Sequence, residues 1–213
     1  MAERSDPRAR PRSTERPGGA PDDAPGEARS GLTGQLLLAM PGMRDPRFER
    51  AVVFLCENSR KGSMGLVVNK PSEEVGFRDL ARHLDVEVPP GAPELSVHVG
   101  GPVEPGRGFV LHSADYERPG ATLRVSPRFG MTATVDVLRE IARGEGPSRA
   151  LLALGYTGWA PGQLEAEIAA NGWLTATATL EAVFDLPDPR KWGAALASLG
   201  VDPMGLSAAA GRA

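Results

Sequence analysis

Residues 50–71 read Arg-Ala-Val-Val-Phe-Leu-Cys-Glu-Asn-Ser-Arg-Lys-Gly-Ser-Met-Gly-Leu-Val-Val-Asn-Lys-Pro, and this segment points to a β-hairpin. Its first part, Arg50–Cys56, is apolar at successive positions and rich in β-branched residues, which is typical of a strand buried on both faces. The polar stretch Glu57–Gly62 predicts the turn. Ser63–Asn69 predicts the returning strand, which Pro71 ends because proline cannot donate a ladder hydrogen bond. The segment therefore predicts an antiparallel pair whose first strand is central.

The rest of the chain mixes strands and helices without regular alternation. Apolar or alternating runs predict six further strands: Gly34–Met40, Leu95–Val99, Gly108–His112, Thr122–Val125, Ala150–Leu154 and Thr177–Asp185. Helical periodicity and helix-end signals predict four helices: Phe77–Leu84, Thr134–Arg143, Pro161–Asn171 and Pro189–Leu199. Because several strands follow one another through short connections, the order favours the α+β class, with a mixed, largely antiparallel sheet and flanking helices.

The two ends of the chain differ in composition from its centre. The first 30 of the 213 residues hold five Pro, three Gly and twelve charged side chains, with Met1 as their one large apolar residue. Such a segment cannot bury enough apolar surface to offset the entropy lost on ordering. We therefore predict a disordered tail over 1–30, one domain over 31–206 and a flexible C-terminus over 207–213.

Several segments together resemble the AlgH/YqgE family of bacterial proteins. They occur in the expected order: Leu38–Phe48, Val52–Glu57, Gly62–Pro71, Gly100–Val103, Arg107–Ser113, Leu154–Ile168 and Asn171–Leu174. The resemblance runs from about residue 31 to residue 206 and leaves the N-terminal tail outside. It implies an α+β domain whose sheet forms an open pseudo-barrel packed with helices, in a cytosolic bacterial protein with no established activity. The family's label associates it with transcriptional regulation.

Charge and hydropathy narrow the range of partners. The net charge is −3 and no run of basic residues exceeds two, so extensive phosphate contacts are not predicted and nucleic-acid binding is disfavoured. No apolar run approaches the ~20 residues of a membrane-spanning helix, so no membrane partner is expected. A single cysteine and the lack of a signal-peptide pattern favour a cytoplasmic location.

Cys56 is the only thiol of the chain and ends an apolar strand beside Glu57. A reactive cysteine needs a nearby cation, helix N-terminus or histidine that lowers the pKa of its thiol. Free cysteine is also among the residue types most often buried. We therefore interpret Cys56 as an inert core residue, with redox sensing or nucleophilic catalysis as the alternative.

His98 and His112 fall in two predicted strands that could pair, which would bring their imidazoles together. Two histidines without a third ligand make a weak zinc site, and His83 stands at no metal-ligand spacing from them. We interpret both residues as polar positions on a half-exposed sheet, and we predict neither a metal nor a cofactor.

Turn chemistry gathers polar residues near the ends of the predicted hairpin. Asp45 precedes Pro46, and an aspartate in this position can bond its own backbone two residues on. Asn69 and Lys70 stand at the far end of the returning strand. We expect any surface site to lie at these loops, and a polar pocket beside Cys56, Asp45 and Asn69 is the feature that would reveal it.

Two tryptophans bracket the helix predicted over Pro161–Asn171. Aromatic residues with a polar handle occur at binding surfaces, but they also anchor cores in a chain with only 5% aromatic residues. We interpret Trp159 and Trp173, with Gln163 and Glu165 between them, as core or boundary residues. We predict that Trp173 packs on the sheet as a core anchor and binds nothing; a ligand or partner face is the alternative.

No motif of the sequence completes a catalytic constellation, and three hypotheses follow. The first is a non-enzymatic regulatory or protein-interaction role with an unidentified protein partner. The second is a thiol-based sensor or enzyme that uses Cys56. The third is a DNA-binding transcriptional regulator, which rests on the family label alone because no predicted helix pair has the short turn of a helix-turn-helix. We rank them in that order, and the oligomeric state stays open.

Overall fold

The computed structural model describes residues 31–43 and 45–202, so the segments predicted over 1–30 and 207–213 lie outside the described residues. The strands are β1 (Gln35–Ala39), β2 (Val52–Ser59), β3 (Gly62–Val67), β4 (Val97–Val99), β5 (Val103–Ser113), β6 (Thr122–Arg124), β7 (Phe129–Thr132), β8 (Ala150–Trp159) and β9 (Trp173–Thr177). The helices are α1 (Phe77–His83), α2 (Val135–Ala142), α3 (Gln163–Ala169) and α4 (Asp188–Ser198), with a 3-10 turn η1 (Pro46–Phe48) and a π-helical turn η2 (Glu181–Asp185). None of these described helices is long and apolar enough to cross a bilayer.

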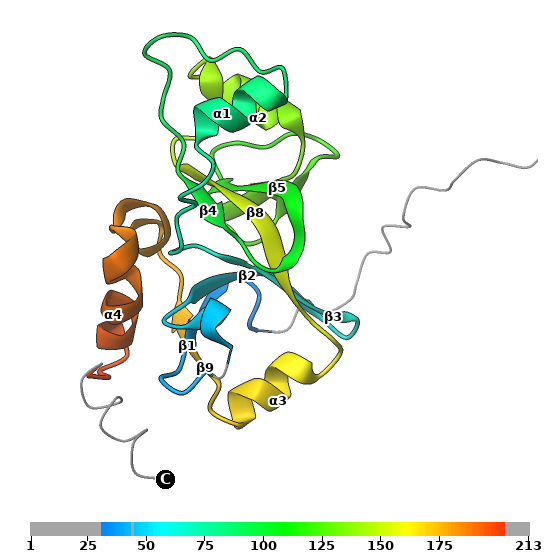
Figure 1. Ribbon diagram of the computed structural model, residues 1–213. Helices are drawn as coiled ribbons and strands as arrows, with labels where there is room; N and C mark the ends of the chain where they lie inside the picture. Colours follow the sequence, from blue (N-terminus) through cyan, green and yellow to red (C-terminus); the bar gives the residue numbers. More distant parts are fainter. Residues whose placement is uncertain (1–30, 44, 203–213) are drawn as a thin grey trace, which may run out of the picture.

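The nine described strands form one curled sheet that resembles half of a barrel (Figure 1). Its order is β6-β7-β5-β8-β3-β2-β1-β9, and β4 pairs with β8 off this path. The β4–β8 pair is parallel, while the other strand pairs are antiparallel. The predicted α+β class, with its mixed and largely antiparallel sheet, is confirmed.

The hairpin predicted over residues 50–71 is confirmed, since β2 pairs antiparallel with β3 on one side and with β1 on the other. Its first strand is buried on both faces, because neighbouring side chains such as Phe54 and Leu55 are both fully buried. A β-bulge just after Leu55 lets β2 continue through polar residues to Ser59. The turn is therefore shorter than the predicted segment Glu57–Gly62.

Successive side chains of β1 and β2 point into two different cores, as strand geometry requires. One core contains Leu36 together with Trp192 of α4. The other contains Leu37 together with Leu164 of α3 and Trp173 of β9. A third cluster joins α1 and α2 to β4, β5 and β8 (Figure 1). The half of the sheet that contains β1 and β9 thus lies between α3 and α4.

Strand β8 departs most from prediction, because it continues beyond Leu154 to Trp159. Gly155 and Gly158 conceal this continuation in the sequence, since glycine is depleted in strands. Gly155 has φ +71°, and a Cβ there would lie 2.4 Å from the carbonyl oxygen of Gly101. Only glycine allows this close approach of the two backbones. Because β8 pairs with β3, β4 and β5, it joins the two halves of the sheet.

Near the edges of the sheet, one strand was not predicted and one predicted strand is wrong. Strand β7 is missed because it contains Gly130, whose missing side chain leaves room for the ring of His112. The strand predicted over Thr177–Asp185 is wrong: β9 ends at Thr177, and η2 follows. There the Thr179 hydroxyl accepts the N–H of Ala182 at 3.0 Å, a helix-capping contact that overrides the β propensity of the threonine-rich run.

Candidate functional site

A cleft of about 1120 Å³ opens beside the end of β8, between the segment that follows β1 and the segment from α3 to β9. Its apolar side chains include three aromatic residues and two methionines: Phe48, Trp159, Trp173, Met40 and Met43. Its longer polar side chains are Asp45, Arg47, Gln163, Glu167 and Asn171. The cleft therefore combines a large apolar lining with a few polar groups, which is the usual composition of a binding site.

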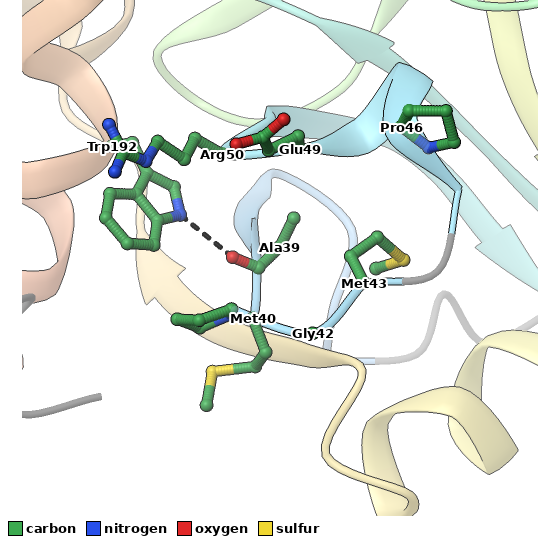
Figure 2. Close-up of a pocket in the computed structure, with 9 residues that line it drawn as sticks. Ala39, Met40, Gly42, Met43, Pro46, Glu49, Arg50 and Trp192 are labelled. Carbon is green, nitrogen blue, oxygen red and sulfur yellow. Dashed lines mark hydrogen bonds between the residues drawn. The ribbon is translucent and has the colours of Figure 1, made fainter. Parts of the chain in front are cut away.

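A smaller cavity of about 330 Å³ shares residues 40–43 with the cleft. Figure 2 shows the indole N–H of Trp192 donating to the carbonyl oxygen of Ala39 at 2.9 Å. The guanidinium of Arg50 lies over the same indole, 5.7 Å from the ring centroid. These contacts fasten α4 to the end of β1, so they also anchor the loop that forms one wall of the cleft.

The carboxylate of Glu167 organises the aromatic wall of the cleft. Its Oε2 accepts the indole N–H of Trp173 at 2.8 Å and that of Trp159 at 3.0 Å. Its Oε1 accepts the amide N–H of Gln163 at 2.8 Å. The two indoles stand nearly perpendicular, with centroids 5.8 Å apart and planes at 80°. Because hydrogen bonds to a charged acceptor are roughly twice as strong as neutral ones, one side chain fixes both rings.

The C-terminal end of α3 brings Trp173 to this carboxylate. Asn171 adopts a left-handed conformation with φ +58°, and its N–H bonds to the carbonyl oxygen of Ile168 at 2.9 Å. The N–H of Gly172 bonds to the carbonyl oxygen of Glu167 at 2.8 Å. This pair of bonds is the Schellman helix end, so the predicted helix stop at Asn171-Gly172 is confirmed. The chain reverses there, and β9 begins beside the helix it has just left.

Turn η1 supplies another wall of the cleft. The Asp45 carboxylate accepts the backbone N–H of Arg47 at 3.0 Å, the turn contact predicted from the sequence, and also pairs with the Arg47 guanidinium at 2.6 Å. The hydrogen bond from Arg47 lowers the pKa of Asp45. The turn presents Phe48, whose ring meets Trp173 edge-on at 5.7 Å. Asp45 thus lies at the cleft with its charge balanced by Arg47.

Asn69 and Lys70 do not line the cleft. The side chain of Asn69 accepts the N–H of Val52 at 2.8 Å and donates to the carbonyl oxygen of Arg50 at 2.9 Å. The carbonyl oxygen of Lys70 accepts the N–H of Val99 at 2.8 Å. Both residues connect the end of the hairpin to neighbouring backbone.

Cys56 is buried in the core, with 2% of its surface exposed, as expected. Its thiol lies 3.8 Å from the carbonyl oxygen of Phe54. Burial, and to a smaller extent the charge of Glu57, raises the pKa of the Cys56 thiol. Since the thiolate is the reactive form, this environment favours an inert side chain, and the reactivity itself stays a prediction.

The expected pairing of the two histidine-bearing strands is wrong, because β8 lies between β4 and β5. His98 is opposite Ala153 on one side of β8, and His112 is opposite Ala150 on the other. Both imidazoles are buried rather than half-exposed. Both ring nitrogens of His112 have hydrogen-bond partners, whereas His98 has one at Nε2 and its buried Nδ1 has none. In the described part of the chain, no three His, Cys, Asp or Glu side chains converge as a metal site.

His98 belongs to a buried polar cluster that holds α4 on the sheet. Its Nε2 donates to Asp188 Oδ1 at 3.1 Å, and Lys191 Nζ pairs with the same oxygen at 2.8 Å. Lys191 also donates to the carbonyl oxygen of Val68 at 2.8 Å. Burial opposes ionisation of Asp188, but the bonds from His98 and Lys191 prevail and lower its pKa. The cluster gives His98 a structural role.

His112 bridges β5 and β7 as a neutral imidazole. Its Nδ1 donates to the carbonyl oxygen of Ser113 at 2.9 Å, because a carbonyl can only accept. Its Nε2 then accepts the hydroxyl proton of Thr132, 3.0 Å away. Burial lowers the pKa of His112, against the opposing effects of Ser113 and Asp115.

Sequence reasoning selected Glu165 and missed Glu167. Glu165 accepts a hydrogen bond from Asn58 at 3.0 Å and does not line the cleft. The usable signal was spacing: Gln163 and Glu167 stand four residues apart, on one face of a helix, with a tryptophan beyond each helix end. The burial expected for Trp173 is confirmed, since only 2% of its surface is exposed.

The described residues form an α+β domain in which a half-barrel sheet carries a cleft lined by aromatic residues. The AlgH-like family model (DUF179) matches residues 36–204. A UPF0301 protein of Cereibacter sphaeroides is 57% identical over 182 residues, which are 85% of this chain and 99% of that protein. A UPF0301 protein of Rhodopseudomonas palustris is 48% identical over 212 residues, covering 96% of this chain and 97% of that one.

A solved structure of the same family has a similar fold. The solution structure of the AlgH protein from Pseudomonas aeruginosa has a TM-score of 0.69 and 39% identity, covering 91% of this chain and all of that one. The chain belongs to the AlgH-like family. Four of the segments that carry the resemblance meet at the cleft: Leu38–Phe48, Gly100–Val103, Leu154–Ile168 and Asn171–Leu174.

We predict that Trp173→Ala lowers the free energy of unfolding by ~3–5 kcal/mol, because it removes a buried ring and leaves a cavity. Trp173→Phe, which keeps an apolar ring but removes the N–H that Glu167 accepts, should cost less. Chemical denaturation of both variants measures the two effects. A near-wild-type midpoint for Trp173→Ala would mean that the indole is not a core anchor.

We also predict that His112 makes stability depend on pH. Burial holds its folded-state pKa below the ordinary value of ~6.5, so the unfolded chain takes up the proton first as the pH falls. Its contribution is complete above about pH 6.5 and is lost as the pH falls through the folded-state pKa. Between about pH 8 and pH 5, unfolding free energy should fall less steeply for His112→Gln than for the wild type. The exposed-site control His83→Gln should keep the wild-type slope; equal slopes for all three would contradict the assignment.

Proposed function

We propose that this chain is a non-enzymatic protein-interaction domain with a regulatory role in the cytoplasm, and that the cleft holds its protein partner. The observation that carries the proposal is the aromatic wall fixed by Glu167. Trp159 and Trp173 are nearly buried, so they support the cleft as a fixed backing before any partner arrives. A preorganised surface loses little conformational freedom on binding, which favours affinity.

The size and lining of the cleft support a macromolecular partner. Its volume of about 1120 Å³ is somewhat above the ~300–1,000 Å³ typical of small-molecule pockets. Aromatic residues and methionine are enriched at protein interfaces. Met40 and Met43 add flexible side chains that adapt to an irregular surface. A segment of a partner protein is therefore the occupant that this lining suits best.

The two alternative functions find less support. A sensor or nucleophile at Cys56 would have to overcome the raised pKa of a buried thiol. A DNA-binding role would have to overcome a net charge of −3 without a concentrated basic surface in the sequence. Cys56 does not line the cleft.

Adjacent alanines at the end of α3 offer a matched test in living cells. Ala170 lines the cleft, whereas its neighbour Ala169 is exposed and does not. With a photo-crosslinking amino acid at each position in turn, illumination should yield a defined protein adduct from position 170 and not from position 169. Mass spectrometry would identify the attached protein. Failure of position 170 to crosslink any protein, or identical adducts from both positions, would contradict the proposed role of the cleft.

A further inference from the structure

The charge of Glu167 is not balanced by any cation of the described residues. Its three hydrogen-bond donors, two indoles and one amide, are all neutral. The other carboxylate of the cleft differs, because Asp45 is paired with Arg47. Among the described residues, Asp45 is thus paired with a cation and Glu167 with none.

The surroundings of Glu167 suit a cation that carries an apolar stem. The Trp173 indole lies between the other two rings of the wall. Its centroid is 5.8 Å from that of Trp159 and 5.7 Å from that of Phe48. The indole N–H groups of Trp159 and Trp173 already occupy Glu167 Oε2, so a cation would reach the carboxylate from the open side of the cleft while its stem lies along the apolar lining. The methylene groups of lysine or arginine can cover apolar surface while the charged head reaches a carboxylate.

We propose that the partner segment presents a lysine or arginine, flanked by apolar residues, and that this cation pairs with Glu167. The inference rests on the proposed protein-binding function and specifies its partner. A purely apolar occupant would desolvate Glu167 without supplying a counter-charge, which is costly. An acidic occupant would add like-charge repulsion. A basic segment satisfies both the carboxylate and the apolar lining.

Panning the full chain against a displayed random dodecapeptide library tests the charge requirement without knowledge of the natural partner. We expect the selected peptides to carry Lys or Arg beside apolar residues. Glu167→Gln should lose binding, whereas Glu165→Gln, with the same charge change on the same helix, should retain it. Replacing arginine by neutral citrulline in a synthetic copy of the best peptide should weaken wild-type binding about tenfold.

The salt dependence of peptide binding can be measured on the wild type alone, so it tests the inference even if Glu167→Gln does not fold. Raising the ionic strength should weaken binding of the arginine peptide and leave that of the citrulline peptide unchanged. Peptides that compete for the cleft without a basic residue, or that bind equally after the citrulline replacement, would overturn the inference and leave the protein-binding role intact. Phe48 lines the cleft, so Phe48→Ala should weaken any peptide that binds there. If no selected peptide is weakened, both the basic-segment inference and the proposed protein-binding function are contradicted.

A synthetic peptide of residues 1–30 separates the partner from the chain itself, because this segment contains six arginines. It lacks large apolar residues other than Met1, so we expect it not to compete with the selected peptides. Competition by this peptide would assign the cleft to the chain's own N-terminal segment and would overturn the partner assignment.

Discussion

The carboxylate of Glu167 joins three elements that are separate in the sequence, since it accepts hydrogen bonds from side chains of β8, α3 and β9. Trp159 and Trp173 are nearly buried, with 7% and 2% of their surfaces exposed. Removing the carboxylate would leave their indole N–H groups without this acceptor, at a cost of ~1–3 kcal/mol for each N–H that stays buried. The arrangement of the two indoles depends on this one side chain, which also supplements the packing of Leu164 in seating α3 on the sheet.

The fold could be predicted where local pattern and tertiary packing agree. The hairpin of β2 and β3 follows from a run of residues that is apolar on both faces, and α1 and α2 follow from helical periodicity. The long strand β8 could not be predicted, because Gly155 and Gly158 are unfavourable in an isolated strand, and the backbone that approaches Gly155 comes from residues far away in the sequence. The run after Thr177 shows the opposite case, in which β propensity is overridden by the turn that leads to α4.

The candidate site was predictable only in parts. The turn contact of Asp45 and the burial of Trp173 followed from residue type and spacing. The role of Glu167 did not, because it depends on how Trp159 of β8, eight residues before Glu167, is placed relative to the helix. The environment of His98 was equally hidden, since its partner Asp188 is 90 residues away along the chain. The contact between His98 and Asp188 is set by topology, whereas the i, i+4 spacing of Gln163 and Glu167 is a local signal for the site.

Hydrogen exchange of the three indole N–H groups tests most directly whether Glu167 fixes the aromatic wall. In the wild type, NMR should show all three protected, since Trp159 and Trp173 donate to Glu167 and Trp192 donates to the carbonyl oxygen of Ala39. In Glu167→Ala, exchange at Trp159 and Trp173 should accelerate together while exchange at Trp192 stays unchanged. Unaltered protection of Trp159 and Trp173, or an equal acceleration at Trp192, would contradict the central place given to this carboxylate.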